Sequence, residues 1–113
     1  MLKTFGRIFR KSEKPSGQAV LIYLNGTDLE DSVYEAYDLD GLEKAIVAAL
    51  GPTGEWDGNE TGPIETTVFL YGADAERMFA RIEPVIHDYP LCKKARIVIR
   101  KGGPGAIQRE VRL

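Results

Sequence analysis

The sequence has few of the residues from which covalent links and metal sites are built. Its 113 residues include one cysteine, Cys92, and one histidine, His87. A lone cysteine cannot form an internal disulfide, and a domain of this size without one fits a reducing compartment. One thiol and one imidazole are too few for a zinc site, and neither C-x-x-C nor H-x-x-x-H spacing occurs. We therefore expect no metal, no cofactor and a cytoplasmic location.

Catalytic signatures are also missing. A nucleophilic Cys92 would need a lowered pKa and a base beside it, and His87 lies upstream, near the expected end of a helix. The glycines of 102–105 lead from one expected strand into another, so no helix N-terminus is placed to receive a phosphate. No residue is predicted to be catalytic, and a non-enzymatic function is favoured.

Long apolar runs and strong net charge are absent as well. No stretch approaches the roughly 18 apolar residues that span a bilayer. A signal peptide would need an apolar stretch of about 7 to 15 residues, which Gly6, Arg7 and Arg10 interrupt. Fifteen basic residues against seventeen acidic ones give a net charge of -2, a poor match to a phosphate backbone. We therefore expect neither a membrane nor a nucleic acid as a partner.

The charge that is present lies unevenly along the chain. Residues 1–17 hold five basic residues and one acidic residue, a net charge of +4. Residues 18–91 hold three basic and fifteen acidic residues, a net charge of -12, and residues 92–113 hold seven and one, a net charge of +6. The length supports one domain. We predict a basic, flexible N-terminal tail at 1–17 and a single α+β domain at 18–113.

The basic tail also has an amphipathic pattern. Leu2, Phe5, Ile8 and Phe9 would share one face of a short helix, with the basic residues opposite, which is typical of a membrane-surface anchor. A helix of about ten residues is only marginally stable alone, so a frayed tail is the favoured interpretation.

Two helices and five strands are expected in the domain. Apolar residues at helical spacing predict a helix over 39–50, with Asp40 and Glu43 resembling a capping box. A second helix follows Asp74 and extends to about residue 89, and Pro84 within it predicts a kink or a break. Alternating or β-favouring runs predict strands over 18–24, 95–101 and 107–113. Two further runs predict a hairpin over 53–71, which turns between Gly58 and Pro63. Residues 27–40 fit a loop, a turn of helix or a short strand.

Read in order, these elements give β-α-β-β-α-β with one added C-terminal strand. This is the split βαβ, ferredoxin-like arrangement, in which two helices pack on one face of an antiparallel sheet. The first and third strands lie centrally in that topology, and they are the two most apolar runs of the chain. We therefore expect a sheet with one face covered by helices and one face left over.

The left-over face is predicted to be apolar and aromatic. Its expected members are Phe69, Tyr71, Arg96, Val98 and Arg100, together with part of the first strand. A patch of several hundred Å² is unusual on a monomer unless something covers it. A second copy is the favoured cover, which predicts a homodimer. Another protein or peptide is the next candidate, and single-stranded nucleic acid is the last, because the RNP1 pattern is missing.

A polar cluster supports an alternative function. Asp57, Asn59, Glu60 and Asp74, with Tyr71 and Arg100, would serve a small-molecule-binding domain or small enzyme if the strand ends converged. The structural interpretation assigns Asp57, Gly58 and Asn59 to turn positions instead. A toxin-neutralising inhibitor is a further alternative, supported by the size and by the acidic central segment.

Four segments carry a resemblance to other proteins: Gly54-Glu55-Trp56-Asp57-Gly58-Asn59-Glu60, Leu70-Tyr71-Gly72-Ala73-Asp74-Ala75-Glu76-Arg77-Met78-Phe79, Ile82-Glu83-Pro84-Val85 and Arg100-Lys101-Gly102-Gly103-Pro104-Gly105-Ala106. Together they resemble a group of small bacterial proteins of unassigned function. The resemblance covers about residues 18 to 113 and implies a bacterial, cytosolic origin, and it implies no activity.

Overall fold

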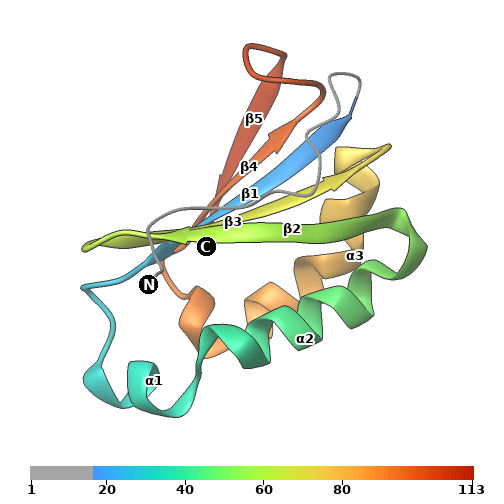
Figure 1. Ribbon diagram of the computed structural model, residues 1–113. Coiled ribbons are helices and arrows are strands. Elements are labelled where there is room, and N and C mark those ends of the chain that lie inside the picture. The colour runs from blue at the N-terminus through green and yellow to red at the C-terminus, as the bar shows by residue number, and fades with distance from the viewer. Residues whose placement is uncertain (1–16) are drawn as a thin grey trace.

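Five antiparallel strands and three α-helices make up the structure, a computed structural model that describes residues 17–113 (Figure 1). All but the last residue of the predicted tail, residues 1–16, lie outside this part. The strands are β1 (Gln18–Asn25), β2 (Gly54–Thr61), β3 (Glu65–Gly72), β4 (Arg96–Arg100) and β5 (Gln108–Arg112). The helices are α1 (Asp31–Ala36), α2 (Leu39–Leu50) and α3 (Ala75–Asp88), with short 3-10 turns η1 (Gly51–Thr53) and η2 (Pro90–Cys92).

The strands lie in the order β2-β3-β1-β4-β5, and every neighbouring pair is antiparallel. The α+β class with an antiparallel sheet is thus confirmed. The order differs from that of a four-stranded ferredoxin-like sheet because β5 pairs with β4 and extends that edge. β1 is the middle strand, in agreement with its apolar side chains at both alternating sets of positions.

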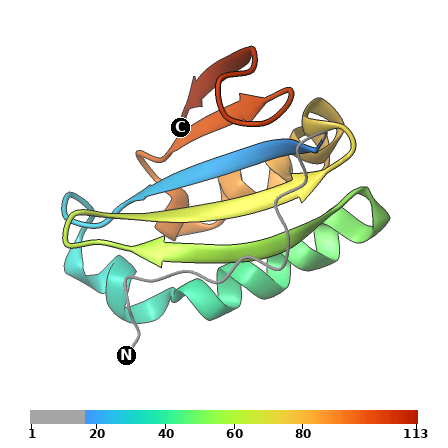
Figure 2. The same cartoon turned by 45° about the horizontal axis from the view of Figure 1, so that its top comes forward.

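The α2 and α3 helices form a layer under one face of the sheet (Figures 1 and 2). α2 has the predicted bounds, but its N-cap is Asp38, whose carboxylate accepts a hydrogen bond from the Gly41 amide at 2.8 Å, and not Asp40. Leu42, Ile46 and Leu50 recur every four residues and are 0–1% exposed against the sheet. Their apolar stripe explains why α2 packs where it does.

α3 continues through Pro84, so the helix does not break there. Proline cannot donate to the carbonyl four residues earlier and clashes with it, at a cost of about 3 kcal/mol. Burial of one helix face offsets this cost, since Met78, Phe79, Ile82 and Ile86 are all buried in the core.

The ambiguous segment before α2 contains the short helix α1, none of whose residues is buried. Tyr34 anchors it from within: its hydroxyl donates to the Asn25 carbonyl at 3.0 Å and accepts from the Leu29 amide at 3.1 Å. A single tyrosine therefore supplies the contacts that an apolar stripe provides elsewhere, which explains why periodicity did not identify this helix.

The Asp57–Gly58 pair corrects the predicted hairpin. These residues and Asn59 lie inside β2, where the register shifts between Trp56 and Gly58, and Gly58 has a φ of 143°. They form a β-bulge, which also requires an unusual backbone at one residue. The chain turns later, between Thr61 and Glu65. The positive-φ signal was interpreted as a turn because bulges and turns use the same residue types.

The fifth strand is tied to the helix layer by an ion pair. Arg109 of β5 donates two hydrogen bonds to the Glu76 carboxylate of α3, from Nε at 2.7 Å and from Nη2 at 2.8 Å. The hydrogen bonds from Arg109 lower the pKa of Glu76. The pair therefore stabilises the fold while Glu76 is ionised.

We expect Glu76→Gln to lower the free energy of unfolding at pH 7, and the difference from wild type to shrink in acid. A carboxyl whose pKa is lowered by folding stabilises above its unfolded pKa, and this contribution is lost as the pH falls through its folded pKa. Urea unfolding at pH 7 and pH 3 measures both differences. Glu35→Gln on the exposed α1 is the control, and a Glu76→Gln difference that is equal at both pH values would contradict the prediction.

Candidate interaction surface

The face of the sheet that is directed away from α2 and α3, called the upper face, contains three complete rows of residues, and Asn25 and Glu65 lie beyond the last row. Residues that pair across antiparallel strands point to the same side. From β2 to β5, the rows are Glu55, Tyr71, Ala19, Arg100 and Gln108; Gly58, Phe69, Leu21, Val98 and Glu110; and Glu60, Thr67, Tyr23, Arg96 and Arg112. Each row runs across the whole sheet.

The centre of the upper face is apolar. Leu21 lies between Phe69 and Val98 in the middle row, and Ala19 adjoins them. These four side chains form a hydrophobic cluster separate from the helix-side core, with Tyr23 and Tyr71 packed against it. The six residues are called the upper-face cluster. Ala19, Leu21, Phe69 and Val98 are only 0%, 7%, 8% and 4% exposed.

Charges of opposite sign flank the cluster on its two sides. On the β2 and β3 side, the upper face carries the carboxylates of Glu55, Glu60 and Glu65. On the β4 and β5 side, it carries three arginines and one glutamate, a net charge of +2: Arg96, Arg100, Arg112 and Glu110. The upper face is therefore polarised across the strands.

Arg96 connects the two sides. Its guanidinium carbon lies 3.9 Å from the centre of the Tyr23 ring, a cation–π contact. Its terminal nitrogens lie 3.7 Å from Glu65 and 3.7 Å from Glu110. The side chain thus lies flat over β1 and extends the apolar surface of the cluster with its own stem.

Arg100 is held at the other end of β4. It is 9% exposed, and its Nε donates to the Gly102 carbonyl at 2.8 Å. This bond links the strand to the glycine-rich loop that leads into β5. The loop glycines therefore act in turn formation, as the sequence indicates.

All five residues predicted for the left-over face lie on the upper face: Phe69, Tyr71, Arg96, Val98 and Arg100. Their expected exposure needs correction, since Phe69, Val98 and Arg100 are buried in the single chain. Leu21 also lies on this face, where strict alternation along β1 places it, although it was not predicted by name. Leu21 was missed because β1 is apolar on both faces, which hides the alternation.

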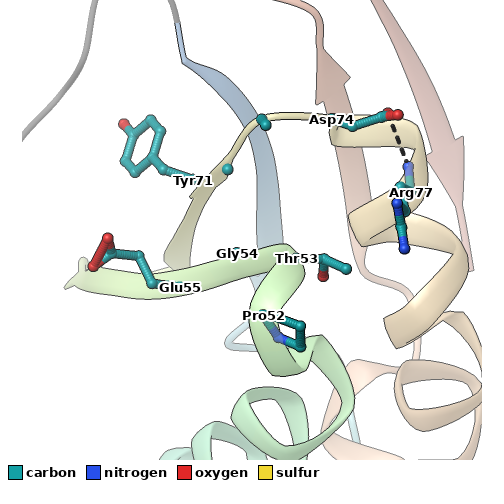
Figure 3. Close-up of a pocket in the computed structure, with 9 residues that line it drawn as sticks. Pro52, Thr53, Gly54, Glu55, Tyr71, Asp74 and Arg77 are labelled. Carbon is teal, nitrogen blue, oxygen red and sulfur yellow. Dashed lines mark hydrogen bonds between the residues drawn. The ribbon is translucent and has the colours of Figure 1, made fainter.

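The four predicted ligand-binding residues lie in two places. Asp57, Asn59 and Glu60 follow one another along β2, with Asp57 5% exposed, whereas Asp74 caps α3 by accepting from the Arg77 amide at 3.1 Å. A pocket of about 530 Å³ lies between η1, the start of β2, the end of β3 and the start of α3 (Figure 3). Of the four, all within the described range, Asp74 alone lines this pocket.

The pocket instead lies where the start of β2 pairs with the end of β3. Glu55 and Tyr71, which are neighbours in the first row, line it and project to the same side (Figure 3). Gly54 and Gly72 also line it. The lining combines the carboxylates of Glu55 and Asp74, the phenol of Tyr71 and the guanidinium of Arg77, and none of these charged side chains is buried.

The two residues considered as a thiol and its base do not form a pair. Cys92 is fully buried, and burial raises the pKa of its thiol to about 12. His87 lies on the exposed side of α3, where its Nε2 is 3.5 Å from Glu83. Because the thiolate is the reactive form, Cys92 has the character of a structural core residue.

Comparison with known families, curated proteins and solved structures finds no match to this chain. Within residues 17–113, no helix is long and apolar enough to cross a membrane. Within the same residues, no three or more His, Cys, Asp or Glu side chains lie together so that they could hold a metal ion. The upper face is therefore the feature on which a functional hypothesis has to be built.

Proposed function

We propose that the protein is a cytoplasmic, non-enzymatic association domain that forms a homodimer through its upper face. The upper-face cluster carries the proposal, because it places an apolar surface, partly exposed at Tyr23 and Tyr71, on the side of the sheet away from α2 and α3. Self-complementary pairing is the commonest way in which soluble proteins bury such a patch. The buried thiol of Cys92, which forms no disulfide, supports the location.

We describe the domain as a split βαβ arrangement extended by β5. The succession β1-α2-β2-β3-α3-β4 supports this description, as does the position of β1 between β3 and β4. An arrangement of this kind leaves one sheet face to a partner.

The polarised charge selects one symmetry for the dimer. A twofold axis parallel to the strands, passing over β1, would place the acidic side of one copy over the basic side of the other. An axis across the strands would place β2 over β2 and bring like charges together, which is unfavourable. With the first axis, Leu21 meets Leu21 of the second copy, Phe69 meets Val98, and Glu60 meets Arg112, because each set shares a row.

The upper face is smaller than a standard protein interface. β1 has eight residues, about 27 Å, and five strands lie about 4.8 Å apart, so the upper face measures on the order of 500 Å². A standard interface buries about 800 Å² on each partner. We therefore expect a reversible dimer, populated at protein concentrations of about 100 µM and above.

The test is an exchange of charge at the edges of the face. Glu60→Arg should weaken the dimer several-fold, because it brings Arg112 of the second copy against a like charge. The double variant Glu60→Arg/Arg112→Glu should regain the wild-type dissociation constant. Both side chains are exposed, so neither change endangers the fold. Sedimentation velocity over a concentration series measures the constants.

A control places an arginine on the opposite side of the molecule. Val47→Arg on the exposed side of α2 should leave the dissociation constant unchanged. A wild-type chain that stays monomeric at every concentration, with the double variant no different from Glu60→Arg, would overturn the proposed function.

A further inference from the structure

Another pocket, called the end pocket, lies at one end of the upper face and has a volume of about 320 Å³. It begins at the third row and continues to the Asn25–Glu65 pair, so that β1, β3, β4 and β5 all contribute to its lining. The loop after β1 and the turn before β3 lie side by side there (Figure 2), joined by a hydrogen bond from the Gly26 amide to the Ile64 carbonyl at 3.0 Å. The end pocket is therefore held by paired strands on its inner side and by a bonded loop at its rim.

Three basic side chains from different elements line the end pocket. Arg96 lies on β4, Arg112 on β5 and Lys94 in the turn that precedes β4. The terminal nitrogens of Arg96 lie 3.7 Å from Glu65 and 3.7 Å from Glu110, and Glu110 also lies 2.8 Å from Arg112. The two distances to Arg96 are longer than a hydrogen bond, so these carboxylates leave its N–H donors available. Arginine donors of this kind match the paired oxygens of a phosphate group.

The two carboxylates that line the end pocket do not cancel its basic charge. Three basic and two acidic side chains give its lining a net charge of +1. The Asp28 carboxylate accepts hydrogen bonds from Asn25 Nδ2 at 3.0 Å and from Thr27 Oγ1 at 3.2 Å, and these bonds lower the pKa of Asp28. Asp28 is thus engaged by its own loop, and Glu65 is the lining carboxylate that competes for the arginines. A carboxylate carries a single charge, so a dianion or trianion is attracted more strongly to the same guanidinium groups.

Lys94 occupies a backbone position that normally belongs to glycine. The Ala95 amide donates to the Cys92 carbonyl at 3.1 Å, Lys93 has φ -59° and ψ 138°, and Lys94 has φ 63°, which together make a type II turn. A side chain in this left-handed region is strained, and within residues 17–113 Lys94 is the one non-glycine residue with a positive φ. Strain of this kind is concentrated at binding sites, where the side chain is needed. The lysine is therefore kept at a cost in stability, at the rim of a pocket with two arginines.

We propose that the end pocket binds a small phosphate-containing anion with two or more charges, held by Lys94, Arg96 and Arg112, and that this anion competes with the second copy. The volume of about 320 Å³ equals that of about ten water molecules, which is enough for a compact ligand such as pyrophosphate. In the proposed dimer Arg112 meets Glu60 of the second copy, and one guanidinium group does not serve both partners. The competition rests on the proposed function, since it names what regulates the same face, whereas the binding of the anion does not.

Binding is tested by titration with pyrophosphate, followed by the backbone amide NMR signals of Asn25, Thr27 and Lys94. The protein concentration is kept well below that at which the dimer forms, and sodium chloride at the same ionic strength is the control salt. We expect these signals to shift with a dissociation constant on the order of 1 mM. Signals that stay in place, or that move equally with sodium chloride, would overturn the inference whatever the dimer does.

Three variants separate the site from general charge effects. Lys94→Gly should weaken pyrophosphate binding about fivefold and leave the free energy of unfolding unchanged or higher, because glycine relieves the strained turn. Lys93→Ala removes the same charge one residue away, outside the lining of the end pocket, and should leave binding near that of wild type. Glu65→Gln should tighten binding several-fold, because it removes the carboxylate that faces Arg96. Equal losses of binding in the two lysine variants would contradict the site.

The competition is measured by sedimentation velocity at a pyrophosphate concentration about ten times its own dissociation constant. The dimer dissociation constant should rise at least about tenfold relative to sodium chloride at the same ionic strength, by linkage between the two equilibria. At the same concentration the rise should be smaller in Lys94→Gly. Pyrophosphate that binds and leaves the dimer constant unchanged would overturn the competition. Pyrophosphate that binds a chain with no dimer at any concentration would uphold the site and overturn the proposed homodimer.

Discussion

Gly72→Ala is expected to destabilise the fold by about 3 kcal/mol, the upper range for overpacking a tight site. A methyl group at Gly72 would overlap the carbonyl oxygen of Thr53, which is backbone and cannot move aside cheaply. It would also lie 2.8 Å from the Met78 sulfur and 3.1 Å from the Gly54 Cα. The close approach is where the end of β3 passes the start of β2 over α3, so relief would require two strands and a helix to separate.

The measurement is urea unfolding followed by tryptophan fluorescence. Gly62→Ala is the matched control, because a methyl group there comes no closer than 3.4 Å to the Glu65 carbonyl, an ordinary contact. The control should change the free energy of unfolding by less than about 1 kcal/mol. Equal effects of the two alanines would show that the crowding at Gly72 is not real.

Ile46→Ala should cost about 2–5 kcal/mol, the range for truncation of a fully buried aliphatic side chain. Ile46 is 0% exposed and lies on the face of α2 that packs against the sheet. Alanine favours a helix at least as well as isoleucine. The loss therefore reports packing and the cavity left behind, and not helix propensity.

The adjacent residue provides the control. Val47 is 48% exposed on the solvent side of the same helix, so Val47→Ala should leave stability within about 0.5 kcal/mol of wild type. If both variants lost the same stability, α2 would not present the face described for it. Thermal unfolding of the two variants under one set of conditions makes this comparison directly.

The parts of the fold that the sequence predicted well depend on periodic burial. α2 has the predicted bounds because Leu42, Ile46 and Leu50 mark one stripe and Gly51 follows them. α3 was predicted on the same grounds, and of the kink or break predicted at Pro84 the break does not occur. The local penalty of a proline is fixed, whereas the burial of a whole helix face depends on tertiary contacts that the sequence does not display.

Residue type was a poorer guide to structure where the same residue type occurs in two kinds of local structure. Gly58 has a positive φ, which the sequence indicated, but it lies in a bulge and not in a turn. α1 depends on the hydroxyl of Tyr34 reaching back to Asn25, a contact between residues nine positions apart. Neither a bulge register nor a tertiary hydrogen bond can be derived from spacing alone.

The sequence predicted which residues form the candidate surface, but it did not predict how deeply they are buried. Alternation along the third and fourth strands was enough to place Phe69 and Val98 on one face. It could not show that these side chains are nearly inaccessible in one chain. The alternation of side chains along a strand identifies which residues share a face of the sheet. The burial of those residues depends on what lies over that face.

The two outermost strands restrict how molecules of this protein can meet. β2 is interrupted by the bulge at Asp57–Gly58, and β5 carries Arg109, Glu110 and Arg112 within five residues. Kinks and ionised side chains at the margins of a sheet hinder strand-to-strand addition of further chains. Growth into fibrils by lateral extension is therefore discouraged at both margins of the sheet.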